Sequence, residues 1–329
     1  MRSIGVHQGI MFVPRAENPG LAAALILIST AFIAASMTFA KALGTGALGP
    51  ALHPLQVSQG RFLFAFLLFA CVAAVQRSTS GPAALPVSSP IHWKLHLGRS
   101  SFGWAGVTLM FASIAYIPMA DATAISFLNP VFAMALAIPL LGERVGRVRW
   151  AAAAIAFLGA MILLRPTPAS FQPGAMLALA AAAVIGMELI FIKKLAGREG
   201  PFQILIINNA IGLVIASLAA VLVWQAPTLL QWAGLAAVGL LMACAQVCFI
   251  NGMARADASY VAPFSYAALV FAALYDFVAF DAVPDWVTWV GAVIILSGAL
   301  MLALREAHLQ RQLTVQRSEK VDAAKNRSV

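Results

Sequence analysis

Charged residues are scarce in this chain. Only 10% of its 329 residues carry a charge, whereas 62% are apolar. A soluble domain is about half apolar and about a quarter charged. So few polar residues could not cover the surface of a soluble protein of this length, and the excess apolar surface must therefore face lipid. The composition excludes a water-soluble globular enzyme, a disordered chain and a secreted disulfide scaffold, and it predicts a polytopic membrane protein.

Motifs for hydrolysis and for metal binding are also missing. We find no P-loop, no HExxH and no His–carboxylate set at metal-ligand spacing. The three cysteines, Cys71, Cys244 and Cys248, lie in apolar stretches and are expected to be packing residues. We therefore expect no catalytic residues, no metal and no cofactor. The net charge of +9 comes from basic residues in short loops and tails, which indicates membrane topology rather than nucleic-acid binding.

Ten apolar runs approach or reach the roughly 17–25 residues that a membrane span needs. They predict an all-α protein with ten transmembrane helices at 20–42, 55–76, 101–118, 121–141, 149–165, 174–194, 202–224, 229–252, 258–279 and 286–304. The predicted domains are a tail at 1–19, a first unit at 20–166 with a loop at 77–100, a second unit at 172–304 and a tail at 305–329.

The basic residues predict the orientation. With the N-terminus in the cytoplasm, 18 of the 21 Lys and Arg residues lie on the cytoplasmic side. Only Lys41, Arg61 and Arg165 lie toward the outside. We therefore expect a multi-pass protein of the inner (plasma) membrane with both termini cytoplasmic.

The second half of the sequence repeats the first. Five short segments recur in the same order: Asn18-Pro19-Gly20 with Gln172-Pro173-Gly174, Lys41-Ala-Leu-Gly with Lys194-Leu-Ala-Gly, His53-Pro54-Leu-Gln56 with Gly200-Pro201-Phe-Gln203, Ala120-Asp121-Ala-Thr with Ala256-Asp257-Ala-Ser, and Arg149-Trp150 with Thr288-Trp289. Each unit has an odd number of spans, so the two units must cross the membrane in opposite directions. Inverted repeats of this kind are typical of secondary transporters, whose substrate site lies between the repeats.

The two units resemble the EamA domains of the drug/metabolite transporter superfamily. The resemblance rests on the segment Ala124-Ile-Ser-Phe-Leu-Asn129-Pro130-Val-Phe, on Leu-Leu-Gly142-Glu143-Arg and on the last span with its glycine. The second unit departs from this pattern, with Phe280-Asp281 in place of Gly142-Glu143. The resemblance implies ten helices around a central cavity, with the fifth and tenth spans at the periphery. It also implies substrates such as riboflavin, S-adenosylmethionine, amino acids or drugs.

Ionisable residues within the spans are the first candidates for function, because burying a charge in a membrane is costly. Glu188 in the sixth span is interpreted as a proton-coupling or cation-binding carboxylate, or as one paired with another helix. Arg61 and Asp276 are predicted to form an ion pair at the outer side, with an anion-binding role for Arg61 as the alternative. Lys41 is expected to lie at the interface, where its side chain can reach water.

Neutral polar residues within the spans are candidate substrate contacts or interhelical hydrogen bonds. Asn129 and Tyr266 lie close to Pro130 and Pro263, and a proline frees a backbone carbonyl within a helix. Further candidates are Asn208, Gln246 and the aromatic Tyr116, which could stack on a flat ligand or simply pack.

These patterns favour a secondary transporter of a small organic metabolite that works by alternating access. A membrane-embedded enzyme or a regulatory membrane protein are the alternatives. An enzyme should show clustered His, Asp or Glu at an interface, and a regulatory protein has no need of an inverted repeat. The expected partners are a small-molecule substrate and lipid, and the sequence leaves proton coupling, homodimer formation and the direction of transport open.

Overall fold

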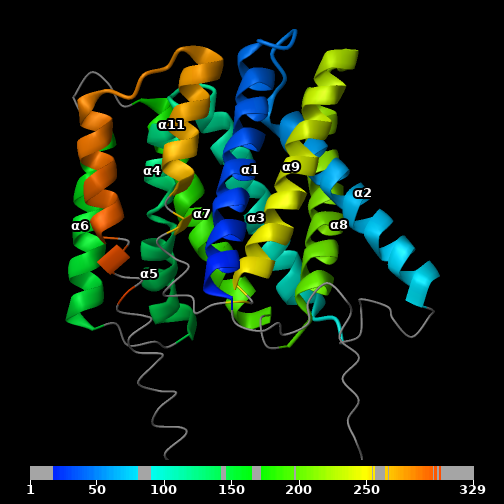
Figure 1. Ribbon diagram of the computed structural model, residues 1–329, viewed down its shortest axis with the longest axis horizontal. Coiled ribbons are helices and arrows are strands. Elements are labelled where there is room, and N and C mark those ends of the chain that lie inside the picture. The colour runs from blue at the N-terminus through cyan, green and yellow to red at the C-terminus, as the bar shows by residue number, and fades with distance from the viewer. Residues whose placement is uncertain are drawn as a thin grey trace, which may run out of the picture.

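The computed structural model describes residues 18–80, 90–141, 146–164, 172–195, 198–253, 255, 264–265, 267–298, 300–301 and 304. All regular structure in these residues is helical, and the helices run roughly side by side (Figure 1). We call the end at which α1 begins the lower end, and the end at which α1 stops the upper end, as they appear in Figure 1.

The helices follow the order of the predicted spans. Their bounds are α1 Pro19–Thr45, α2 Pro54–Ser80, α3 Trp93–Ile114, α4 Met119–Ser126, α5 Asn129–Leu141, α6 Arg147–Leu164, α7 Pro173–Leu195, α8 Pro201–Ala220 with the short 3-10 helix η2 Val221–Val223, α9 Leu229–Met253, α11 Ala267–Phe280 and a further helix Trp286–Gly298.

Proline fixes where four of these helices begin. α1, α2, α7 and α8 each start with a proline, whose missing N–H costs nothing in the first helical turn. Asn18 also caps α1 by accepting a hydrogen bond from the Leu21 N–H at 3.0 Å. These prolines belong to the segments that repeat between the two halves of the sequence, so matched segments begin matched helices.

Length and composition allow six of the described helices to cross a membrane, and these are Gly20–Thr45, Pro54–Gln76, Met119–Leu140, Pro173–Ile192, Pro201–Val223 and Leu229–Met253. Three shorter apolar helices are Trp150–Ile162, Ala267–Phe280 and Trp286–Gly298. Apolar side chains on the outside of the bundle, such as Leu222 and Leu229, are more than four-fifths exposed (84% and 88%). The protein is therefore a multi-pass membrane protein, and the count of ten spans stays a prediction.

The predicted start of the third span is wrong. We expected a loop up to residue 100, but α3 begins at Trp93 and takes Lys94, His96 and Arg99 into the helix. His96 and Arg99 are buried, at 0% and 6% exposure. The mean hydropathy of this segment is low because it contains polar residues, which face neighbouring helices. A search for apolar runs therefore misses this part of the helix.

The fourth span is broken rather than continuous. α4 ends at Ser126 and α5 begins at Asn129, with a turn at Phe127 and Leu128 between them. The N–H groups of Phe127 and Leu128 donate to carbonyls three residues earlier, at 3.1 and 3.0 Å, so the chain tightens there before Pro130 continues in α5. Broken helices at membrane depth are common at transporter binding sites.

The two repeats pack into each other reciprocally. α1 of the first repeat lies against α9 of the second, and α3 of the first lies against α7 of the second (Figure 1). α7 is the counterpart of α1, and α9 is the counterpart of α3. The contact of α1 with α9 and the contact of α7 with α3 are therefore equivalent by the repeat. The two repeats thus form one bundle, and their inverted five-helix plan and the central cavity implied by the resemblance stay predictions.

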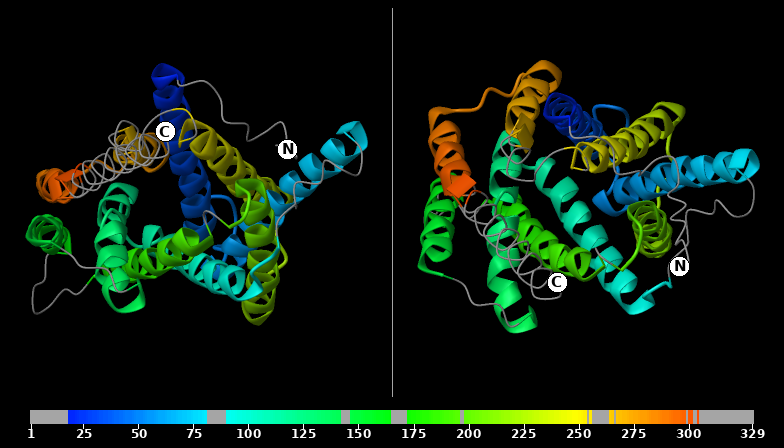
Figure 2. Two further views of the ribbon diagram at one scale, coloured as in Figure 1. Left: turned by 90° about the horizontal axis from the view of Figure 1, so that it is seen from below. Right: turned by 60° about the horizontal axis from the view of Figure 1, so that its bottom comes forward.

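The last helix of each repeat lies at one edge of the bundle. Figure 2 shows α6 and the helix Trp286–Gly298 side by side, away from the other helices. A Cβ on Gly159 would lie 2.6 Å from the Ile295 nitrogen, and one on Gly298 would lie 2.6 Å from the Ala152 carbonyl. These glycines allow the two backbones to approach closely, as small residues do in membranes. The edge position agrees with what the resemblance implied for the fifth and tenth spans.

Candidate functional site

Three charged side chains inside the bundle interact electrostatically, and we call them the central charge cluster: Arg61 of α2, Arg99 of α3 and Glu188 of α7. The Glu188 carboxylate lies 3.9 Å from Nε of Arg99, and its charge attracts both guanidinium groups. Arg61 and Arg99 repel each other in turn. The side chain of Glu188 is 17% exposed and that of Arg99 is 8% exposed. The cluster therefore combines charges from both repeats away from bulk water.

A glycine on α3 provides the room for the carboxylate. A Cβ on Gly103 would lie 2.8 Å from Oε1 of Glu188, which is closer than real Cβ contacts come. The neighbouring contacts are made in the same way, since a Cβ on Gly98 would meet Phe191 at 2.4 Å and one on Gly106 would meet Ile185 at 2.6 Å. A row of glycines on α3 thus brings α7 close enough to hold Glu188 beside Arg99.

α8 contributes the next contacts. Nη1 of Arg99 donates to the backbone carbonyl of Ile204 at 3.1 Å. One turn further along α8, Asn208 accepts a hydrogen bond from the Ser100 hydroxyl at 3.2 Å, and Asn208 is 4% exposed. The predicted candidate Asn208 is therefore next to the central charge cluster, on the side of Arg99.

Several buried polar atoms near the core lack a protein partner. Among the described residues, no hydrogen bond reaches Nε or Nη1 of Arg61, Nε of Arg99, Nε1 of Trp104, Oγ1 of Thr108, Oε1 of Gln59 or Oε1 of Gln246. Buried polar groups are normally paired with protein or water, because desolvating one without a partner costs free energy. These donors and acceptors can bind a polar ligand or water.

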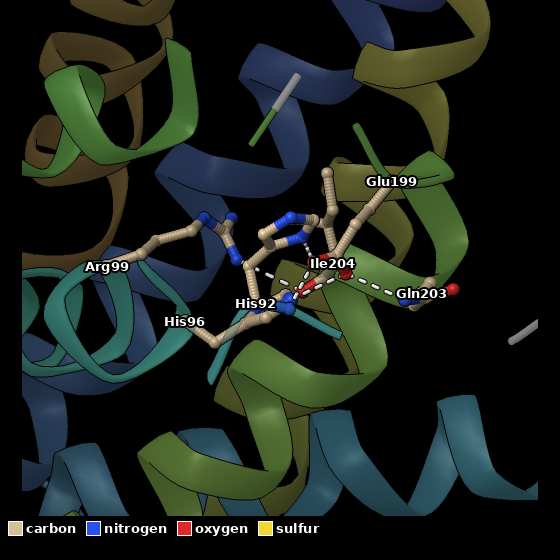
Figure 3. A network of polar contacts seen from close by, with 6 residues as sticks. All are labelled: His92, His96, Arg99, Glu199, Gln203 and Ile204. Atoms are coloured by element: carbon tan, nitrogen blue, oxygen red, sulfur yellow. Dashed lines mark hydrogen bonds and ion pairs between the residues drawn. The ribbon is translucent and has the colours of Figure 1, made fainter. Parts of the chain in front are cut away.

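A second network lies at the lower end, and we call it the lower network: His92, His96, Glu199 and Gln203 (Figure 3). The Glu199 carboxylate accepts a hydrogen bond from the backbone N–H of His92 at 2.8 Å and one from the side-chain amide of Gln203 at 2.7 Å. The rings of His92 and His96 lie 3.0 and 2.7 Å from its two oxygens. Glu199 belongs to the second repeat and the histidines to the first, so the network joins the repeats.

The surroundings of Glu199 change its acidity. Burial alone raises the pKa of a carboxyl group, but the hydrogen bonds from His96 and His92 outweigh burial and lower the pKa of Glu199 to about 2. Glu199 is therefore ionised throughout the physiological pH range. The hydrogen bonds of the lower network are therefore made to an ionised carboxylate.

A network of neutral groups lies at the opposite end, and we call it the upper network: Pro50, Gln56, Gln225 and Gln231. Gln56 donates to the carbonyl of Gln225 at 2.6 Å and accepts the N–H of Gln225 at 3.2 Å. Gln231 donates to the carbonyl of Pro50 at 2.6 Å. Gln56 matches Gln203 in the repeat, so each network contains one of two matched glutamines.

The predicted ion pair between Arg61 and Asp276 is wrong. Asp276 instead pairs with Lys41 of α1 at 2.5 Å and accepts the N–H of Met119 at 2.8 Å. Lys41 is 9% exposed and its ammonium lies 4.8 Å from the centre of the Phe280 ring, so the expectation that its side chain reaches water is wrong, whereas its interfacial depth stays a prediction. Lys41 lies one turn before the end of α1, where α11 and α4 cover it. Whether a side chain there faces water or another helix depends on how α1 is rotated about its axis.

The other predicted contacts are separated from each other. Asn129 is half-buried at the start of α5, where its backbone carbonyl lies against Gly186 of α7. Gln246 is half-buried in α9. Tyr116 is 70% exposed in the turn after α3, at the upper end and far from Arg99. Tyr266 lies outside the described residues.

Sequence reasoning missed Arg99 and the whole lower network. The signal was present, because His92, His96, Arg99 and Gly103 are spaced by four, three and four residues, which places them on one face of a helix. Glu199 had no such signal, since it lies between helices and acquires its role only when α3 and α8 meet.

An all-helical bundle of two interlocked repeats, with an apolar outer surface and buried charges at its centre, defines a membrane transport protein. The chain belongs to the EamA-like transporter family, which matches residues 20–165 and 172–304. It is 29% identical over 259 residues to an S-adenosylmethionine uptake transporter of Rickettsia bellii, covering 79% of this chain and 87% of that protein. It is 35% identical over 240 residues to a riboflavin transporter of Rhizobium johnstonii, covering 70% of this chain and 76% of that protein.

A crystal structure of another protein shares the fold. Its TM-score to this chain is 0.56 at 22% sequence identity, and the match covers 86% of this chain and 97% of the other. The expected membership of the drug/metabolite transporters and the expected transport of a small molecule are thus confirmed by family and relatives.

Proposed function

We propose that this protein is a secondary transporter of the inner (plasma) membrane that moves a small organic metabolite by alternating access. The observation that carries the proposal is the central charge cluster, in which the charges of Arg61 and Arg99 of one repeat attract Glu188 of the other. Charges are expensive at membrane depth and are kept there for function. The named relatives carry S-adenosylmethionine and riboflavin, which are small polar metabolites.

The two end networks suit alternating access. The lower network links α3 to the α7–α8 connection, and the upper network links α2 and the α1–α2 connection to the start of α9. Each joins one repeat to the other, so breaking one network opens one end while the other stays closed. The site between them would then face one side of the membrane at a time.

The orientation and the coupling belong to the same proposal. With Arg99 counted inside the bundle, 17 of the 21 basic residues lie in the predicted cytoplasmic segments, which supports cytoplasmic termini and a cytoplasmic lower end. Glu188 is the proposed proton-coupling residue, because its carboxylate can be neutralised by a proton or by a substrate cation. The exposed apolar side chains of the outer helices are proposed to contact lipid, and no enzymatic step is part of the proposal.

The test is transport in proteoliposomes containing the purified protein. We expect labelled riboflavin or S-adenosylmethionine to exchange across the membrane, and accumulation to follow an imposed proton gradient. Glu188→Gln keeps the shape of the side chain and removes its charge, so this variant should fold but lose accumulation. Asp281→Asn makes the same change in an exposed residue at the upper end and should leave transport intact. Accumulation by Glu188→Gln with the pH dependence of the unsubstituted protein would contradict the coupling role.

A further inference from the structure

Two histidines of the lower network lie where the repeats meet, and they differ in their access to water (Figure 3). The side chain of His92 is 39% exposed, whereas that of His96 is fully buried. Both rings contact the carboxylate of Glu199, through Nδ1 of His92 at 3.0 Å and Nε2 of His96 at 2.7 Å. Histidine ordinarily changes its charge near neutral pH, so these two rings are the candidate proton-binding sites at the lower end.

The surroundings of His96 favour the neutral ring. The ionised Glu199 carboxylate only accepts hydrogen bonds, so the hydrogen of the neutral His96 ring lies on Nε2, which is 2.7 Å from that carboxylate. Nδ1 of His96 is buried and has no hydrogen-bond partner among the described residues. A second proton would create a buried donor at Nδ1 without water or an acceptor, which costs free energy. Arg99, one helical turn further along α3, adds a positive charge that repels this proton.

His92 can bind a proton without creating a buried unpaired donor. Part of its ring is exposed, so the nitrogen that does not contact Glu199 can donate to water. The backbone N–H of His92 donates to the same carboxylate oxygen as its ring contacts, at 2.8 Å, and this bond holds the ring beside Glu199. A proton on His92 therefore keeps the contact and makes it a charge-assisted hydrogen bond, which is stronger than a neutral one.

The net charge of the lower network depends on this proton. With both histidines neutral, the network holds the single negative charge of Glu199, whose side chain is fully buried. One proton on His92 makes the network neutral, and a buried anion with a cationic partner is less costly than a buried anion alone. If the contact breaks, water screens Glu199 and the proton gains less from it. The proton therefore binds more tightly while the repeats are in contact at this end.

Other charged groups do not take the place of this proton. Among the described residues, no hydrogen bond or ion pair joins a further ionisable side chain to Glu199 or to either histidine, and α8 contributes the neutral amide of Gln203. The charged residues on the described parts of the elements packed against α3, or next to the network in sequence, are Glu188 and Lys194 of α7, Arg61 of α2, Lys41 of α1, Asp121 of α4, Lys94 and Arg198.

We propose that His92 is a regulatory proton-binding site, at which one proton strengthens the contact between the repeats and holds the lower end closed. The inference rests on the proposed transport function, in which this contact breaks when the lower end opens. The site is separate from Glu188, so its proton regulates the rate of transport and does not drive accumulation. With the lower end in the cytoplasm, acidification of the cytoplasm slows transport.

The first experiment follows the lower end through the distance between two spin labels, attached at Leu97→Cys on α3 and at Arg198→Cys on the α7–α8 connection. Both residues are exposed, and the three native cysteines are replaced by alanine. Between pH 8 and pH 6 the ratio of the longer to the shorter distance should fall by roughly threefold, as expected for an ion pair with one exposed partner. A distance distribution that is the same at both pH values overturns the inference.

Two substitutions of His92 should act in opposite ways. In His92→Asn the amide nitrogen takes about the place of Nδ1 and keeps a donor for Glu199, but it does not bind a proton. In His92→Lys the positive charge is present at both pH values. We expect the first variant to lose the response to pH and the second to favour the shorter distance already at pH 8. A response that persists in His92→Asn, or a longer distance that dominates in His92→Lys, contradicts the assignment.

Two further histidine variants serve as matched controls. The amide nitrogen of His96→Gln takes about the place of Nε2 and keeps the donor to Glu199, so the response to pH should remain. His53 is exposed at the upper end, where its Nδ1 accepts the N–H of Leu55 at 3.3 Å, and His53→Asn should also keep the response. Loss of the response in either control would assign the proton to another site.

Transport separates a failure of this inference from a failure of the proposed function. Exchange of labelled riboflavin and of S-adenosylmethionine is measured in proteoliposomes with the same pH on both sides. If either is exchanged while the distances do not respond to pH, the transporter assignment stands and the His92 site falls. If the distances respond as expected while neither compound is exchanged, the proton-binding site stands and the transport proposal loses its support.

Discussion

Lys41 of α1 and Asp276 of α11 form a buried ion pair at 2.5 Å, and Asp276 also accepts the N–H of Met119 at the start of α4. One carboxylate thus joins three helices from both repeats at the upper end. Its partners are satisfied, in contrast to Arg61. This pair is a structural contact, and its energetics can be separated from those of the central charge cluster.

Breaking this pair should destabilise the protein. Asp276→Asn or Lys41→Met each leaves a buried charge alone and should lower the free energy of unfolding by about 3–5 kcal/mol. The double variant should recover part of the loss, with a coupling of about 1–3 kcal/mol in a double-mutant cycle. The matched cycle of Arg61→Met with Asp276→Asn should be additive. Coupling in that second cycle would mean that Arg61 and Asp276 interact, as the sequence predicted.

Filling the space at Gly103 should impair transport more than stability. Gly103→Ala places a methyl group 2.8 Å from Oε1 of Glu188 and must move the carboxylate. A displacement of that kind should reduce transport roughly tenfold to hundredfold. Gly106→Ala meets only Ile185 and tests packing of the same two helices, and Gly146→Ala meets nothing within 4 Å. Equal transport losses in Gly103→Ala and Gly106→Ala would show that packing, and not the carboxylate, is responsible.

The lower network should make the free energy of unfolding depend on pH. The pKa of Glu199 is about 2 in the folded protein, below its ordinary value of 4.5. A lowered carboxyl pKa stabilises the fold at pH values above 4.5, and this contribution is lost as the pH falls from there toward 2. Glu199→Gln should therefore lower the stability at pH 7 by roughly 3 kcal/mol. The melting temperatures of the two proteins should converge on acidification, and a difference that is constant from pH 7 to pH 4 and below would refute the role of the charge.

The proposed topology can be tested with single cysteines. In a background with Cys71, Cys244 and Cys248 replaced by alanine, Thr45→Cys and Pro227→Cys should react with an impermeant thiol reagent added outside the cell. Ser318→Cys should react only after the membrane is permeabilised. Labelling of Ser318→Cys alone in intact cells would reverse the orientation.

The sequence predicted the helical, two-repeat architecture well because apolar runs and repeated prolines are local or periodic features. It placed Glu188 and Arg61 within the bundle for the same reason, since a charge in an apolar run is visible by itself. It failed where a helix was polar on one face, so that the beginning of α3, with Arg99, was assigned to a loop. It also failed on partners, because the choice of Lys41 rather than Arg61 by Asp276 depends on how α1, α2 and α11 rotate about their axes.

The break at Phe127 and Leu128 divides the fourth span between two sets of contacts. Both halves pack against α7, and α5 does so at Gly186, but the upper half, α4, is also tied through Met119 to Asp276 and so to α11. A continuous helix would transmit any tilt at one end to the other as a rigid rod. Two half-helices with a joint between them can tilt separately, so the upper half can move with α11 while the lower half keeps its place at Gly186.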